Sequence, residues 1–154
     1  MADVYSRLAE LGMTLPSVAT PAGSYLPAVR SGNHVYVSGQ LPLIDGALPA
    51  TGKVGAEVSP EQANELAARC ALNALAALEQ LVGLAAVTRI VKVTGFVASA
   101  AGFTGQPGVV NGASDLFAAV FGEAGRHARS AVGVAELPLN APVEIEVIAE
   151  VTES

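Results

Sequence analysis

The regular spacing of apolar and polar positions is clearest near the C-terminus. From Val143 to Val151, valine, isoleucine and alanine fill the odd positions, whereas three glutamates and one isoleucine fill the even ones. A period of two is that of a β-strand with one buried face. Residues 128–135 form a second strand-like run that contains Arg129, and the Pro- and Asn-containing segment 137–142 favours a turn. We therefore predict a C-terminal hairpin in which Arg129 lies within reach of a glutamate.

Three further strands are predicted upstream. Residues 24–30 and 34–38 flank a Ser-Gly-Asn turn and should pair as a hairpin, with Pro27 placing the first strand at an edge or a bulge. Residues 87–97 are rich in β-branched side chains and almost continuously apolar, as in a strand covered on both faces. The intervening segment from Leu43 to Val58 is rich in glycine and should be irregular.

Two long helices are predicted between these strands. Ser59, followed by proline and then by Gln62, has the pattern of a helix N-terminus, and an apolar stripe continues to about residue 82. Cys70 lies on this stripe and is expected to be a buried, unreactive thiol. After a glycine-containing loop at 98–110, the second helix should begin with Asn111 as its N-cap and end at Gly122. A short helix over residues 3–11 precedes the first strand.

The predicted order is therefore β-β-α-β-α-β-β in a single α+β domain, residues 1–154, with residues 1–14 as an N-terminal extension. Two helices can cover only one face of a sheet. The second face would carry valine and isoleucine beside arginine and glutamate, with no cover from this chain. We infer that symmetric association covers this face and that binding sites form between subunits.

The amino-acid composition limits the kinds of molecule that this protein is expected to bind. The net charge is −6 and the 8 lysines and arginines form no run, which argues against nucleic acid as a partner. A single cysteine excludes an intramolecular disulfide. The N-terminus has no signal-peptide pattern, and the apolar runs are shorter than the ~18 residues that a membrane-spanning helix needs. We therefore expect a cytoplasmic protein with no membrane partner.

Arg129 allows two interpretations. It can pair with a glutamate of the neighbouring strand, in a surface ion pair that contributes little to stability. It can also bind the carboxylate of a ligand, because its planar guanidinium donates two parallel hydrogen bonds. The strand pattern alone does not choose between them.

A set of short collinear segments resembles the RidA/YjgF family (reactive intermediate deaminase A), whose older name is L-PSP endoribonuclease. These segments span roughly residues 23–151, and SGQLP combined with ARS, LP and VEIE is fairly specific as a set. The matching segments are Gly23-Ser24-Tyr25, Gly32-Asn33, Val37-Ser38-Gly39-Gln40-Leu41-Pro42, Val110-Asn111, Ala128-Arg129-Ser130, Val134-Ala135-Glu136-Leu137-Pro138 and Val143-Glu144-Ile145-Glu146.

The resemblance implies a chorismate-mutase-like fold and a homotrimer with three clefts between subunits. It implies hydrolysis of 2-imino acids, or of their enamine tautomers, to 2-keto acids and ammonia, without a metal or other cofactor. Arg129 matches the arginine that holds the substrate carboxylate, and Glu144 matches the glutamate that positions or activates water. The matching substrate-binding positions are Tyr25, Ser38, Gly39, Asn111 and Ala131.

Structural roles for the same residues remain open. Tyr25 can be a packed edge aromatic, Ser38 can serve the turn, and Asn111 can be only an N-cap. His34 is expected to be a strand residue, and His127 a loop residue beside the arginine.

Several departures indicate a divergent subgroup. The family often has cysteine at position 131, where this chain has Ala131, and the loops at 43–58 and 98–110 differ. An alternative function is therefore a non-catalytic trimer that binds small carboxylates such as 2-keto acids. Ribonuclease action, implied by the older family name, is disfavoured by the acidic charge.

Overall fold

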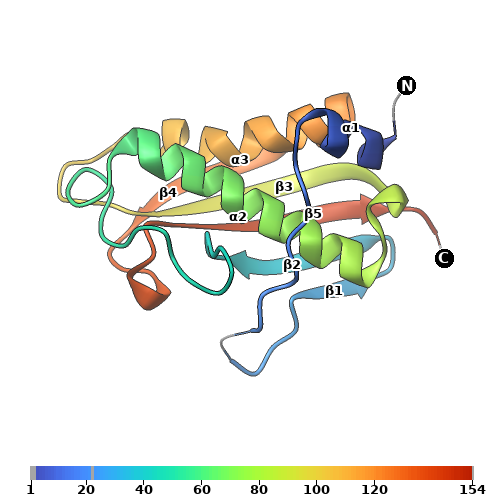
Figure 1. Ribbon diagram of the computed structural model, residues 1–154, viewed down its shortest axis with the longest axis horizontal. Coiled ribbons are helices and arrows are strands. Elements are labelled where there is room, and N and C mark those ends of the chain that lie inside the picture. Colours follow the sequence, from blue (N-terminus) through green and yellow to red (C-terminus); the bar gives the residue numbers. More distant parts are fainter. Residues whose placement is uncertain (1–2, 22, 154) are drawn as a thin grey trace.

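A five-stranded mixed sheet forms one layer of the protein (Figure 1). The computed structural model describes residues 3–21 and 23–153. The described residues do not include 1, 2, 22 and 154. These positions fall within the predicted domain, its N-terminal extension and the link before the first strand. The strands, in their spatial order, are β1 (Ala28–Ser31), β2 (His34–Gln40), β5 (Val143–Val151), β3 (Val87–Ala98) and β4 (Ala128–Val134).

The helices gather on one side of this sheet (Figure 1). The long helices α2 (Pro60–Leu81) and α3 (Gln106–Phe121) pack against each other and against the sheet, and α1 (Val4–Glu10) packs on α3. Three short 3-10 helices connect these elements: η1 (Leu84–Ala86), η2 (Gly122–Gly125) and η3 (Pro138–Asn140). The predicted α+β class and element order are confirmed.

Side-chain caps fix the starts of two helices. The Ser59 hydroxyl accepts a hydrogen bond from the backbone N–H of Gln62 at 3.1 Å, as its position before Pro60 predicts. Asp3 caps α1 in the same way, accepting from the N–H of Ser6 at 2.9 Å. Both helix starts were therefore readable from sequence.

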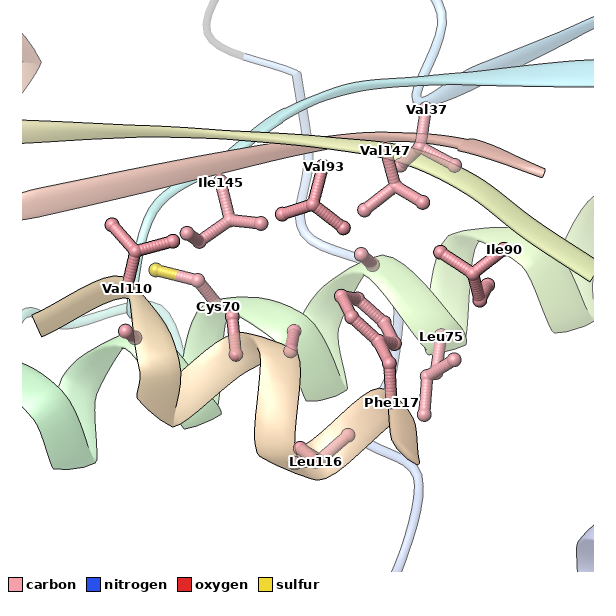
Figure 2. Packing of buried hydrophobic residues seen from close by; sticks show 14 of the residues in the cluster. Val37, Cys70, Leu75, Ile90, Val93, Val110, Leu116, Phe117, Ile145 and Val147 are labelled. Atoms are coloured by element: carbon pink, nitrogen blue, oxygen red, sulfur yellow. The ribbon is translucent and has the colours of Figure 1, made fainter. Parts of the chain in front are cut away.

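The core lies between the sheet and the two long helices (Figure 2). Val93, Ile145 and Val147 of the sheet face Phe117 of α3, and all four are buried. Cys70 of α2 is fully buried in this layer, and burial raises the pKa of its thiol well above the usual range. The prediction of an unreactive core cysteine fits this environment.

The predicted C-terminal hairpin is wrong. β4 pairs in parallel with β3, and β3 separates it from β5, so that Val93 lies between Arg129 and Val147. The physical reason is the α3 crossover: a strand that follows a helix packed on the sheet returns parallel to the strand before that helix. Residues 135–142 therefore span the end of β3 instead of closing a tight turn.

The second long helix begins earlier than predicted. It starts at Gln106 after Gly105, so Asn111 lies inside α3 and is not its N-cap. Gly108 and Gly112 lower the helix propensity of this segment, so its apolar pattern did not predict a helix. A proline in the first turn is nevertheless a helix-start signal. The first strand is also shorter than predicted, since β1 begins only after Pro27.

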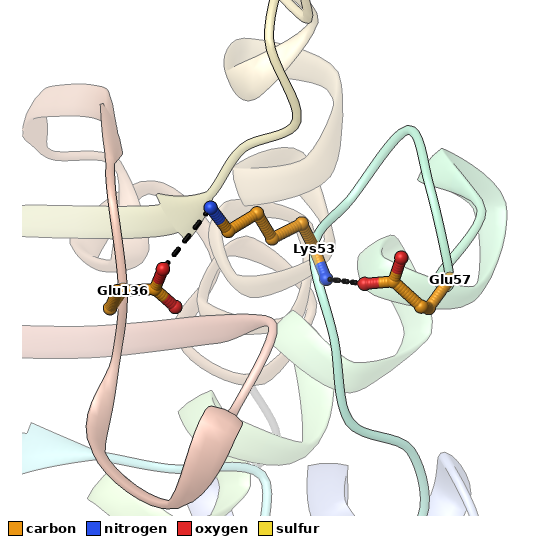
Figure 3. A network of polar contacts seen from close by, with 3 residues as sticks. All are labelled: Lys53, Glu57 and Glu136. Carbon is orange, nitrogen blue, oxygen red and sulfur yellow. Dashed lines mark hydrogen bonds and ion pairs between the residues drawn. The ribbon is translucent and has the colours of Figure 1, made fainter.

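The irregular segment 43–58 is fixed to the sheet by its backbone. The N–H of Val54 donates to the carbonyl of Ala98 at 2.7 Å, and Val54 accepts from the N–H of Ala100 at 3.0 Å. Lys53 adds polar contacts: its N–H donates to Glu57 at 2.9 Å, and its ammonium lies 3.2 Å from Glu136 (Figure 3). The segment is therefore irregular in form but anchored at the end of β3.

The face of the sheet away from the helices has no cover from this chain, within the part that the structure describes. Val29, Tyr36 and Val132 are 48%, 48% and 42% exposed there, next to the even-numbered residues of β5. Residues 87–97 were predicted to be covered on both faces, and the described part of this chain covers one of them. This face therefore carries exposed apolar side chains beside the glutamates of β5.

A glycine sets the distance between the two long helices, which gives a stability test. A Cβ at position 112 would overlap the backbone carbonyl of Asn64 on α2, whereas a Cβ at position 108 would meet nothing. We expect Gly112→Ala to destabilise the protein by about 1–3 kcal/mol. Gly108→Ala, the matched control, should be neutral or stabilising by about 0.5–1 kcal/mol.

Thermal melts of both variants measure this difference. Equal melting temperatures for the two variants would contradict the close helix contact.

Candidate functional site

Arg129 lies on the helical side of the sheet, at the β4 edge. Its partner in β3 is Val93, which points into the core, so the arginine side chain turns towards α3. Nη1 donates to Oδ1 of Asn111 at 2.7 Å and to Oγ of Ser114 at 3.2 Å. Nη2 donates to the carbonyl of Pro107 at 3.4 Å. Three acceptors on one helix thus hold the guanidinium.

These contacts leave one edge of the guanidinium available. Arginine has five N–H groups, and the three bonds to α3 use both hydrogens of Nη1 and one of Nη2. The N–H of Nε and the second N–H of Nη2 have no partner among the described residues. Nε and Nη2 share an edge, and a planar carboxylate can bridge two such donors. The interpretation of Arg129 as the partner of a glutamate is therefore wrong.

Glu144 lies on the opposite face of the sheet. It is an even-numbered residue of β5, paired with Phe96, and its side chain is half-buried on the face that the helices leave open. Burial raises the pKa of its carboxyl group, and the nearby charge of Glu146 raises it further. A Cβ at position 39 would overlap the Glu144 carboxylate, so Gly39 allows this side chain to lie against the β2 backbone.

Tyr25 and Ser38 lie at the same end of β2. The Ser38 hydroxyl donates to the carbonyl of Leu26 at 2.6 Å, which supports the structural role that its turn position allowed. Tyr25 is 49% exposed, and it lines a cavity of about 500 Å³ together with Gly39 and Leu41. Neither Glu144 nor Arg129 lines this cavity, which extends to Arg69 and Asn73 of α2.

The predicted site residues therefore form two clusters. The arginine cluster contains Arg129, Asn111 and Ala131, and Ala131 lies two residues beyond the arginine on the same face of β4. The carboxylate cluster contains Glu144, Gly39, Tyr25 and Ser38. The alternation along β4 and β5 sends the two charged groups to opposite faces, so one chain does not bring them together.

Ser114 was not singled out from sequence, and His127 was expected only as a loop residue beside the arginine. Nε2 of His127 lies 2.9 Å from Oγ of Ser114, and Nδ1 lies 2.6 Å from the carbonyl of Gly125. Ser114, His127 and Arg129 line a second cavity of about 350 Å³, together with Arg126 and Asp115. The sequence did contain a signal for this contact. Ser114 follows Asn111 by three residues, which places both on one face of a helix, and His127 precedes Arg129 by two residues, the spacing of one strand face.

The described residues contain neither a cluster of metal-binding side chains nor a membrane-spanning helix. No three His, Cys, Asp or Glu side chains gather where they could hold a metal ion, in residues 3–21 and 23–153. No helix within these ranges is long and apolar enough to cross a membrane.

Comparison with known proteins decides the family. The model of the family described as Endoribonuclease L-PSP matches residues 16–151. The chain belongs to the RidA/YjgF family. Protein TCP17 of Trypanosoma cruzi is 45% identical over 149 residues, covering 96% of this chain and 93% of TCP17.

Other members of the RidA/YjgF family carry an activity in their names. The 2-iminobutanoate/2-iminopropanoate deaminase of Escherichia coli K12 is 36% identical over 143 residues, which is 90% of this chain and 98% of that protein. The crystal structure of Atu1372 from Agrobacterium tumefaciens is 48% identical, covers 97% of this chain and 92% of its own, and superposes with a TM-score of 0.90. The fold is therefore that of the family, and imine deamination is an activity found within it.

The raised pKa of Glu144 predicts how stability depends on pH. The folded chain binds this proton more tightly than the unfolded chain, where a glutamate has its ordinary pKa of 4.5. Stability from this group is therefore greatest below that value and is lost as pH rises through the folded pKa. Glu144→Gln should raise the melting temperature at pH 7 and change it little at pH 4.

Thermal melts across this pH range measure the effect. Glu10→Gln, which removes an exposed carboxylate of α1, is the matched control. The same increase in both variants at pH 7 would show that net charge, and not burial, is responsible.

Proposed function

We propose that this protein hydrolyses 2-imino acids and their enamine tautomers to 2-keto acids and ammonia, in a site shared between two subunits of a homotrimer. The observation that carries the proposal is the open edge of Arg129, whose other N–H groups are already bound to α3. A pair of parallel donors beside a cavity suits the carboxylate that every 2-imino acid carries. Binding that carboxylate fixes the adjacent C=N carbon in space.

Glu144 acts as the general base for the attacking water. Water attacks the carbon of the protonated imine, the C=N π electrons move to nitrogen, and the Glu144 carboxylate accepts the proton that water loses. The hydroxyl proton of the carbinolamine is then transferred to the nitrogen. The C–N bond breaks, ammonia leaves and the C=O bond forms. A carboxylate whose pKa is raised by burial is a better base for this transfer than an exposed one.

The opposite placement of the two charged groups supports a shared site. Arg129 faces α3 at the β4 edge, whereas Glu144 faces the open side of the sheet. A second chain packed on that open face would bring its own β4 edge next to the glutamate, and it would also cover Val29, Tyr36 and Val132. The resemblance to RidA proteins supports a closed ring of three chains, in which each interface is of the same kind.

A second candidate function is a carboxylate-binding trimer without turnover. Ala131 favours it, because alanine has no group that can take part in chemistry where family members often have cysteine. This function needs the Arg129 edge but not the Glu144 base, so the two candidates differ in what a Glu144 substitution does.

The deaminase activity is tested by generating imino acids in place with an amino-acid oxidase and following ammonia and keto acid release. We expect Arg129→Lys to lower kcat/KM by about 100-fold, because a point charge replaces the bidentate fork. Glu144→Gln should lower kcat by about 10²–10⁴-fold. Arg30→Lys is the matched control, because Arg30 binds only the carbonyls of Gly32 and Thr152 at the opposite edge of the sheet.

Release no faster than the uncatalysed reaction, combined with calorimetric binding of 2-oxobutanoate that Glu144→Gln leaves intact, would instead support the carboxylate-binding trimer.

The shared site is tested by mixing two inactive subunits. If each site takes its arginine from one chain and its glutamate from the next, a trimer that contains both Arg129→Ala and Glu144→Gln chains has one intact site. Random co-assembly of equal amounts should therefore restore about one quarter of the wild-type activity. A site contained in one chain would give no restoration. Light scattering of the co-assembled protein measures the trimer mass independently.

A further inference from the structure

The tautomer of His127 is set by the backbone. Nδ1 lies 2.6 Å from the carbonyl oxygen of Gly125, and a carbonyl only accepts, so Nδ1 carries a hydrogen. In the neutral ring Nε2 is then an acceptor, and the Ser114 hydroxyl at 2.9 Å is the group that donates to it. The ring also packs edge-on against the buried Phe117, with centroids 6.1 Å apart and planes at 87°.

This arrangement orients Ser114. A serine hydroxyl has one hydrogen, and here it is directed to His127, so the oxygen lone pairs remain for Nη1 of Arg129 at 3.2 Å. Without the imidazole acceptor, the hydroxyl of a mid-helix serine can turn its hydrogen to the carbonyl four residues before it. The oxygen would then present a different geometry to the arginine.

Ser114 in turn decides which edge of Arg129 is open. Asn111 and Ser114 together use both hydrogens of Nη1, which removes the Nη1–Nη2 edge from ligand binding. The edge formed by Nε and Nη2 is left. If Ser114 were absent, Nη1 would regain a free hydrogen and the guanidinium could rotate about its last side-chain bonds.

We propose that Ser114 and His127 are positioning residues for Arg129: His127 orients the Ser114 hydroxyl, and Ser114 fixes the guanidinium so that its Nε–Nη2 edge faces the ligand carboxylate. This role rests on the proposed function for its purpose, but the hydrogen-bond chain exists independently of turnover. It extends the site from the residues that contact substrate to the α3–β4 connection and, through Phe117, to the core.

A nucleophilic role for the same pair is the competing explanation. Serine bonded to histidine is also the arrangement of a hydrolase dyad. Here the histidine is held by a neutral carbonyl instead of a carboxylate, and Arg129 donates to the serine oxygen that would have to attack. Both features favour positioning, and a fluorophosphonate probe distinguishes the two roles.

The first test is nuclear magnetic resonance on the full-length protein, and it needs no ligand. Long-range ¹H–¹⁵N spectra of His127 should show a protonated Nδ1 and, in the neutral ring, an unprotonated Nε2. The guanidinium signals of Arg129 should show restricted rotation that is lost in Ser114→Ala and retained in Ser114→Thr. A protonated Nε2 with a bare Nδ1, or Arg129 signals unchanged by Ser114→Ala, would overturn the proposal.

The second test measures carboxylate binding and catalysis. Ser114→Ala should weaken 2-oxobutanoate binding and raise KM by about tenfold, the effect of one hydrogen bond to a charged group, with a smaller change in kcat. His127→Phe keeps the aromatic contact with Phe117 and should weaken binding in the same direction but less. Ser114→Thr should restore affinity, because it keeps the hydroxyl.

A double mutant shows whether His127 acts through Ser114. If it does, the Ser114→Ala and His127→Phe double mutant should bind no more weakly than Ser114→Ala alone. Additive losses, or covalent labelling of Ser114 by the fluorophosphonate, would overturn the proposal. If the magnetic resonance and binding results hold while imine turnover is absent, the deaminase proposal fails and the positioning role stands.

Discussion

The pleat of the central strands determines where each functional side chain lies. Along β5 the odd residues enter the core between the sheet and the long helices, so the even residues, Glu144 among them, must face the other way. The same constraint turns Arg129 towards α3, because its partner Val93 is a core residue. The two charges that the proposed chemistry needs are therefore separated by the sheet itself. A site that uses both requires another copy of the chain.

Arg129 and Glu144 lie in different electrostatic environments. The guanidinium of Arg129 is held by neutral acceptors only, and no acidic group is among its hydrogen-bond partners. Glu144 lies in a partly desolvated position beside a second glutamate, which makes it more basic. One group is thus suited to binding an anion and the other to accepting a proton. The separation of these environments is a property of the fold before any ligand is bound.

Sequence predicted the local features well and the long-range ones less well. The β5 alternation gave the orientation of Glu144, and the serine-proline start gave α2, because both signals depend on neighbours in the chain. The β4 pairing was wrong because the turn-forming residues at 137–142 do not reveal whether the link passes one strand or two. The α3 start was missed because Gly108 and Gly112 look like loop residues, although Gly112 is required by the close approach of α2. The contact between Ser114 and His127 was missed because it joins a helix to the segment before β4.

All three acceptors that hold the Arg129 guanidinium belong to α3, and none belongs to the strand that carries the arginine. The direction of the Arg129 side chain is thus set by α3, and the position of α3 is set in turn by the contact of Gly112 with α2. A substitution deep between the two helices would shift α3 and re-aim the guanidinium without touching any ligand-facing atom. Ligand preference among related chains can therefore diverge through interior packing while every residue in contact with the ligand stays the same.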